Sequence, residues 1–153
     1  MEELNCILNA WLAEQGFETR VRGEEDAFGY YSVSDVISYT FSMRETAIIS
    51  WENLMEELKC PVLMNQFYTA FLHELGHAET LHWLTEEEEL FSAVEEARLA
   101  EEEDVLAADY EYYHLPREII ATQWAMEYIS NHLEAVRKLV ELTAPLLNKM
   151  TNY

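Results

Sequence analysis

The sequence predicts an α+β fold in which a small antiparallel β-sheet precedes a predominantly helical C-terminal half. Between residues 17 and 51, short runs rich in aromatic and β-branched residues alternate with polar turns, as strands do. From residue 52 onward, apolar residues recur at the spacing of amphipathic helices. No Pro/Gly-rich linker and no internal repeat interrupts the 153 residues, so we expect a single domain over residues 1–153.

The N-terminal part, about residues 1–51, combines one helix with a β-meander. Residues 2–15 predict a helix, because four large apolar residues share one side of it and Gly16 follows. Four segments predict the strands of the meander: residues 17–22, 27–33, 36–41 and 46–51. In the first of them, apolar residues or threonine alternate with charged residues, which indicates a half-buried strand.

The helical part covers about residues 52–153. We expect helices over residues 52–58, 67–83, 85–106 and 116–147, with a break at Cys60-Pro61. The acidic insert, about residues 85–106, holds ten Asp and Glu residues among apolar residues at roughly helical spacing. This pattern indicates a solvated amphipathic helix or a helical hairpin over the core rather than a disordered tail.

The formal net charge of −21 restricts the classes of partner. Nucleic acids bind proteins largely through Lys and Arg, and this chain has 9 of these against 30 Asp and Glu, so we expect no direct nucleic-acid binding. The charge instead favours a basic partner protein, mimicry of DNA, or simple solubility. The chain has no long uncharged apolar run and no basic n-region, so we expect a cytoplasmic protein without a membrane partner. Cys6 and Cys60 are expected to be free thiols.

The motif His73-Glu74-Leu75-Gly76-His77 lies inside the helix predicted over residues 67–83. Histidines four residues apart share one helix face, about 6 Å apart along the axis, so their imidazoles can bind the same zinc ion. Glu74 lies about 100° further round and can act on a metal-bound water as a general base. Two His ligands with a Glu base predict a zinc metallopeptidase site. The alternative is an incidental pair of helix histidines.

A zinc site of this kind needs a third protein ligand, and Glu118 is the candidate. Its helix face carries only small residues, which allows a close approach to the helix of the motif. The alternative is a carboxylate placed in the first helical turn to favour the helix dipole. His114 is the second candidate for the third ligand. Tyr113 or His114, like the neighbouring Tyr110 and Tyr112, could donate a hydrogen bond to a transition state, although such clusters also form cores and rims.

Two segments of the chain resemble the ImmA/IrrE metallopeptidases: Phe71-Leu72-His73-Glu74-Leu75-Gly76-His77 and Glu118-x-x-Ala121-Thr122-x-Trp124-Ala125. The resemblance implies a gluzincin-type, zincin-like fold, with His73, His77 and Glu118 binding one zinc ion and Glu74 as catalytic acid/base. Thr122 stands where the family usually has Asn, and Trp124 where it usually has Phe.

The resemblance also implies regulated proteolysis in bacteria or their mobile elements, typically of a DNA-binding repressor. We therefore expect a zinc-dependent metalloendopeptidase whose substrate is a protein or peptide, such as a basic DNA-binding regulator. The alternative is an acidic, non-catalytic binding or DNA-mimic protein that retains a structural zinc site. A Glu beside the histidines argues weakly against this alternative, because neither binding nor mimicry needs it.

Overall fold

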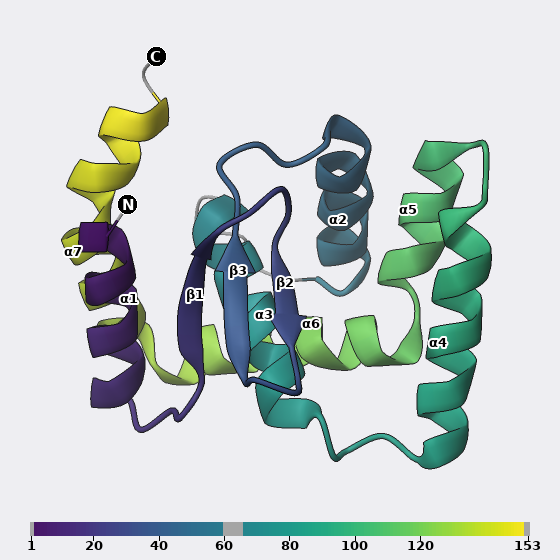
Figure 1. The fold of residues 1–153 in the computed structure, drawn as a ribbon, viewed down its shortest axis with the longest axis horizontal. Coiled ribbons are helices and arrows are strands. Elements are labelled where there is room, and N and C mark those ends of the chain that lie inside the picture. Colours follow the sequence, from purple (N-terminus) through teal and green to yellow (C-terminus); the bar gives the residue numbers. More distant parts are fainter. Residues whose placement is uncertain (1, 60–65, 152–153) are drawn as a thin grey trace.

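A computed structural model describes residues 2–59 and 66–151, which form seven helices and three strands (Figure 1). In chain order they are α1 (Glu2–Glu14), β1 (Arg20–Glu24), β2 (Gly29–Tyr31), β3 (Val36–Tyr39), α2 (Glu45–Glu57), α3 (Gln66–Thr80), α4 (Glu86–Ala100), α5 (Val105–Tyr113), α6 (Pro116–Asn131) and α7 (Leu133–Thr151). The predicted α+β class and the helical C-terminal half are confirmed. The predicted break at Cys60-Pro61 lies outside the described residues, as does Cys60, whereas Cys6 is a free, exposed cysteine.

The sheet is mixed, so the prediction of an antiparallel meander was wrong. Its strand order is β1-β3-β2, with β3 antiparallel to β2 and parallel to β1. β3 is the most buried of the three strands and takes the centre. Since the hairpin places β2 on one side of β3, β1 pairs with the other side. The strands β1 and β2 are therefore the edges of the sheet.

Residues 46–51, predicted as a fourth strand, form the first half of α2 instead. The apolar run Thr46–Trp51 fits a strand by composition, but its burial follows the helical period. The buried residues of α2 are Ala47, Ser50, Trp51, Leu54 and Met55. The short helix predicted over residues 52–58 is the continuation of α2.

The C-terminal half divides more finely than predicted. Of the two forms predicted for the acidic insert, the structure has the helical hairpin, made of α4 and α5. A capping box between Thr85 and Glu88 begins α4, and the Asp104 side chain caps α5. The single helix predicted over residues 116–147 is wrong, because α6 and α7 are separated at His132, whose φ of −134° and ψ of 45° leave the helical region.

Helix α3 lies at the centre of the molecule, between the sheet and α6 (Figure 1). Phe71, Leu72 and Leu75 are fully buried in the main core. Gly76 brings α3 and α6 into direct backbone contact, because a Cβ at this position would stand 2.4 Å from the carbonyl oxygen of Ala121. No larger residue fits this crossing without displacing a helix.

Helices α1 and α7, near the two ends of the chain, pack against each other. The Trp11 indole Nε1 donates a hydrogen bond of 2.8 Å to the backbone oxygen of Ala135, and Lys138 Nζ lies 2.6 Å from a carboxylate oxygen of Glu14. Both helices contribute fully buried leucines to the main core. None of the helices formed by the described residues is long and apolar enough to cross a membrane.

Candidate metal centre

Helix α3 holds His73 and His77 one turn apart, with their ring nitrogens facing each other. The two Nε2 atoms are 3.1 Å apart and the ring centroids 4.7 Å apart. The His73 side chain is buried among Trp51, Tyr113 and the neighbouring helix, whereas the His77 side chain is partly exposed. The His73 ring therefore lies inside the protein, whereas the His77 ring lies at an opening.

The first turn of α6 delivers Glu118 to the same point. Its side chain is 2% exposed, with Oε1 3.1 Å from His73 Nε2 and Oε2 3.0 Å from His77 Nε2. Burial on its own would raise the pKa of Glu118, but the two histidines lower it well below the usual range through charge and hydrogen bonds. The Gly76–Ala121 contact sets the distance between α3 and α6 next to the site, and so places Glu118 beside the two histidines.

Thr122, one turn after Glu118 on α6, orients the His73 ring. Its Oγ1 lies 2.9 Å from His73 Nδ1, and the hydroxyl is buried. When Nδ1 carries the proton and donates to this hydroxyl, the lone pair of Nε2 points toward His77 and Glu118. A hydrogen bond to the far nitrogen of a ligand histidine commonly selects the metal-binding tautomer in this way. The sequence drew attention to Thr122 for its small size and because it stands where the ImmA/IrrE family usually has Asn, but not as a partner of His73.

The separations of these donor atoms suit a tetrahedral metal ion. Atoms bound at about 2.0–2.1 Å to a tetrahedral zinc ion lie roughly 3.3–3.4 Å from one another. His73 Nε2 lies 3.1 Å from His77 Nε2 and 3.1 Å from Glu118 Oε1, and His77 Nε2 lies 3.0 Å from the second oxygen, Glu118 Oε2. Without a shared proton or a cation, unprotonated lone pairs this close repel one another. The donor set therefore fits a metal ion in number, chemistry and spacing.

Glu74 is a second carboxylate near the histidines. His73, Glu74 and His77 form a group that can hold a metal ion, with one ligand atom from each within 4.8 Å of the others. Burial raises the pKa of Glu74, and the charges of His77 and His73 partly offset this rise. Glu118 lies closer to both nitrogens than this limit, so the site contains one carboxylate in contact with the histidines and one beside them.

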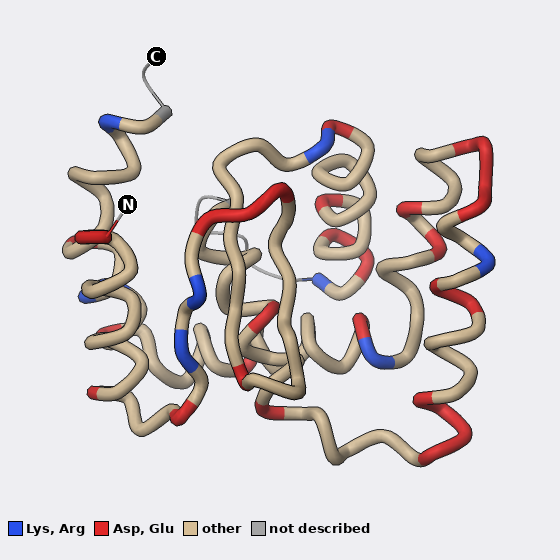
Figure 2. Tube along the Cα trace, in the orientation of Figure 1, with Lys and Arg blue, Asp and Glu red and all other residues tan. Residues whose placement is uncertain are grey.

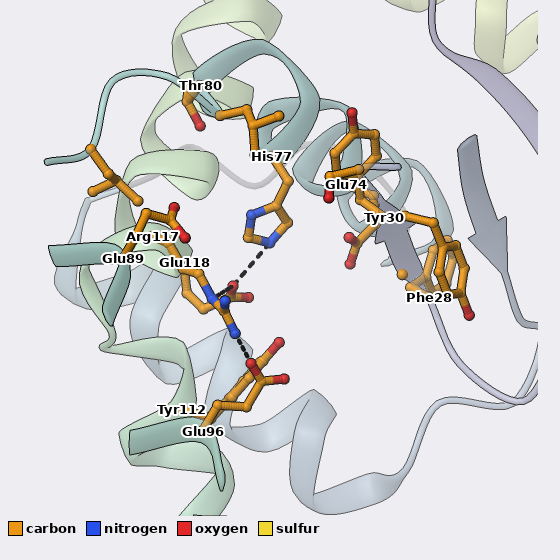
Figure 3. Close-up of a pocket in the computed structure, with 15 residues that line it drawn as sticks. Phe28, Tyr30, Glu74, His77, Thr80, Glu89, Glu96, Tyr112, Arg117 and Glu118 are labelled. Atoms are coloured by element: carbon orange, nitrogen blue, oxygen red, sulfur yellow. Dashed lines mark ion pairs between the residues drawn. The ribbon is translucent and has the colours of Figure 1, made fainter. Parts of the chain in front are cut away.

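A cleft of about 420 Å³ opens onto this group (Figure 3). Residues 28–32, including the edge strand β2, line one side of it, and α4 and α6 line the other. In Figure 3, Tyr30 and Phe28 lie on one side of His77, with Arg117, Glu96 and Tyr112 on the other. Glu74, His77 and Glu118 are among the residues that line the cleft. The candidate metal centre is therefore accessible to a ligand of peptide size.

Arg117 connects the centre to the acidic hairpin. Its guanidinium forms an ion pair with Glu96 on α4, and its Nε lies 3.8 Å from Glu118 Oε2 (Figure 3). Among the described residues that line the cleft, Arg117 is the only Lys or Arg. No local pattern singles out Arg117, although it directly precedes Glu118, because its partner Glu96 lies on another helix.

Of two further predicted candidates, His114 lies away from the donor atoms, whereas Tyr113 packs beside His73 with ring centroids 6.5 Å apart. His114 Nε2 is 2.7 Å from Glu57 Oε2, and its Nδ1 is 2.7 Å from the backbone oxygen of Tyr110, so this ring joins α5 to α2. Tyr113 stacks on Trp51, with ring centroids 6.0 Å apart. Tyr112 lines the cleft, and burial together with the charges of Glu118 and Glu74 raises the pKa of its phenol. The structure thus brings Tyr112, rather than its neighbours, to the opening.

Comparison with protein-family models, curated proteins and solved structures finds no match to this chain.

Proposed function

We propose that this chain is a zinc-dependent metalloendopeptidase. His73, His77 and Glu118 bind the metal, and Glu74 carries the proton. The observation that carries the proposal is the position of Glu118, whose two oxygens lie 3.1 and 3.0 Å from the two imidazole Nε2 atoms at the base of an open cleft. Two histidines and one carboxylate, with one position left open, are a usual ligand set of catalytic zinc.

The two carboxylates have different environments, which supports different roles. Glu118 contacts both histidines and keeps a lowered pKa, so it remains a carboxylate, the form that binds a metal. Glu74 faces the cleft and has a raised pKa because it is buried. A carboxylate with a raised pKa exchanges protons near neutral pH more effectively.

Zinc, when bound, supplies a Lewis acid that lowers the pKa of a coordinated water and polarises a carbonyl group. The chain itself supplies the proton transfer. A carboxylate oxygen of Glu74 accepts a proton as the nucleophile forms and returns it to the leaving amine. The Tyr112 phenol, kept neutral by its raised pKa, lines the cleft and is the candidate donor of a hydrogen bond to a developing negative charge.

The substrate class follows from the walls of the cleft. Strand β2 is a sheet edge that lines the cleft, so an extended peptide can pair with its free backbone groups. The opposite wall contributes the carboxylates of Glu89 and Glu96 from α4. These features favour an extended, basic segment of a protein, as in a DNA-binding regulator.

The test compares Glu74→Gln with Glu79→Gln, which removes the same charge from an exposed position on the same helix. Glu74→Gln should keep the fold and the metal yet lose hydrolysis by about 10²–10⁴-fold, whereas Glu79→Gln should retain it. Elemental analysis should find about one zinc ion per chain in each variant. Substrates are identified by capture on Glu74→Gln and then incubated with the wild-type protein.

The alternative of an acidic binding protein with a structural metal gives a different result. In that case the captured partner would remain intact with zinc-loaded wild type, and Glu74→Gln would leave no functional trace. Absence of zinc after reconstitution would overturn both possibilities.

A further inference from the structure

Helix α4 exposes three of its large apolar side chains to solvent. Its only buried residues are Ser92 and Leu99. Leu90, Phe91 and Val94, in contrast, are 66%, 53% and 57% exposed. Because each residue of a helix advances by about 100°, these three share one side, opposite to Ser92. Large apolar residues gathered on one exposed side of an element mark interaction sites more often than solvated surface.

Acidic residues stand at both ends of this apolar group. Glu86 and Glu87 begin the helix, and the acidic run 101–104 follows it (Figure 2). The only cation of α4 is Arg98, which is already ion-paired with Glu95 at 2.7 Å and Glu111 at 2.8 Å. We call this surface the α4 outer face, defined by Glu86, Glu87, Leu90, Phe91, Val94 and Glu101. It is apolar in the middle and negative at its ends.

We propose that the α4 outer face binds a basic amphipathic helix of a partner protein. An apolar stripe on such a helix would cover Leu90, Phe91 and Val94, which here face solvent. Flanking Lys and Arg residues would meet the carboxylates at both ends of α4. The acidic ends of the α4 outer face therefore favour a partner with basic flanks, and its exposed apolar side chains favour an apolar stripe between them.

A second copy of this chain is a poor occupant of the same face. Both ends of α4 are acidic, so parallel or antiparallel pairing of two α4 helices would bring like charges together. The net charge of −21 per chain adds to this repulsion. A basic partner avoids both the contact between like charges on α4 and the overall repulsion between two acidic chains.

The α4 outer face does not contain the candidate metal ligands. The side chains of α4 that line the cleft, Glu89 and Glu96, lie on other sides of the helix. Partner binding is therefore independent of the metal and of the proposed peptidase activity. A failure of this proposal can be told from a failure of the proposed function, because it is measured without hydrolysis.

The probe is a short synthetic peptide of leucine and lysine with its leucines at helical spacing, and the control peptide has the same composition in scrambled order. Binding to the full chain is measured by calorimetry with EDTA present, so that no cleavage follows. The amphipathic peptide should bind more tightly than the scrambled one, and its affinity should fall as salt is raised.

Phe91→Gln with Val94→Gln should weaken binding of the amphipathic peptide by about tenfold or more. Val33→Gln with Leu142→Gln, which changes two exposed apolar residues outside α4, should leave it unchanged. Glu86→Gln with Glu87→Gln should reduce the salt dependence. Circular dichroism confirms that each variant is folded. Equal binding by wild type and Phe91→Gln/Val94→Gln would overturn the proposal, as would a wild-type dimer that this double variant abolishes.

Discussion

The α3–α6 pair and the α4–α5 hairpin place polar and apolar side chains in opposite ways. At the α3–α6 crossing, His73, Glu118 and Thr122 are each at most 2% exposed, in a position that ordinary packing would fill with apolar groups. On α4, Leu90 and Phe91 are more than half exposed, where a surface helix would ordinarily carry polar groups. The two regions contact each other through Arg117 and Glu96.

The difference shows how each kind of departure from ordinary packing relates to a task. Buried polar groups are costly unless they are paired, so the α3–α6 crossing needs a complete set of partners inside the protein. Exposed apolar groups cost little in the free chain, but their burial can stabilise a complex. The polar groups of the α3–α6 crossing must therefore be paired within the protein, whereas the apolar side chains of α4 can remain exposed until a partner binds.

The largest effect is expected where the two helices touch. Gly76→Val should lower the free energy of unfolding by about 3 kcal/mol or more, because its side chain would collide with the backbone of Ala121. Urea denaturation measures this loss. Ala97→Val, which places the same side chain on the exposed side of α4, should change stability little. Equal stability of the two variants would remove the contrast in rigidity between the regions.

The next largest effect is expected on zinc affinity, when Glu118 is removed from the buried donor set. Glu118→Ala should weaken zinc binding by more than about 100-fold, beyond the range seen when only an outer partner of a ligand is removed. Competition with a chelator measures the affinity. Glu127→Ala, at an exposed position on the same helix, should bind zinc as the wild type does. Loss of the metal in His114→Ala, with Glu118→Ala unaffected, would show that the third ligand has been misassigned.

The pH dependence of the metal-free chain should report the charge buried at this crossing. Burial alone would lower the pKa of His77, but the charge and hydrogen bond of Glu118 and the charge of Glu74 raise it to about 9 from 6.5. His77 therefore contributes its full stability below pH 6.5, where it is protonated in the folded and unfolded chain. This contribution disappears as the pH rises through about 9.

We expect the loss to be about 3 kcal/mol. Urea denaturation with EDTA at pH 6 and pH 9.5 measures it. His77→Gln serves as the control, since it retains every other titrating group and should show a smaller loss. The same slope in both proteins would mean that His77 and Glu118 form no favourable pair in the folded chain.

Thr122→Val tests whether the Thr122 hydroxyl orients His73, and a smaller loss of zinc affinity is expected. The variant keeps the shape of the side chain but removes the hydroxyl that lies 2.9 Å from Nδ1. Zinc affinity should fall by about tenfold. Thr122→Ser, which restores a hydroxyl, should recover most of the loss. If the valine variant bound zinc normally, orientation of His73 by this hydroxyl would have no role.

The smallest effect is expected on the hairpin. Phe91→Gln with Val94→Gln should change the free energy of unfolding by no more than about 0.5 kcal/mol, as is usual for exposed positions. Leu75→Gln, which places an amide in the fully buried core of α3, should cause the chain to unfold at much lower urea. A large loss from the α4 pair would show that these side chains support the fold itself.

The sequence predicted the helix of the candidate site well because its evidence was local. The His73-to-His77 spacing lies within one helical turn, and the apolar residues around it have the helical period. Glu118 was also predicted as a neighbour, from its small-residue helix face and from the resemblance to the ImmA/IrrE metallopeptidases. The roles of Arg117 and Tyr112 depend on tertiary contacts with α4 and the cleft, which no local pattern reveals.

The wrong predictions of secondary structure and strand pairing also concern features that tertiary contacts decide. Thr46–Trp51 is too short for its apolar run to distinguish a strand from a helix, and packing on α5 decided the outcome. The parallel pairing of β1 with β3 follows from which side of β3 the hairpin leaves free. The end of α6 at His132 has no Gly or Pro signal, whereas Pro145, a usual helix breaker, lies within α7.

The contact between α1 and α7 has a consequence for synthesis on the ribosome. Trp11 and Ala135, joined by a hydrogen bond, are 124 positions apart. At about 5–20 residues per second, roughly 6 to 25 s separate the translation of the two. During this time the apolar side of α1 that α7 covers stays open to chaperones and to neighbouring nascent chains. Faster folding of the central helices cannot shorten this interval, because it is set by elongation.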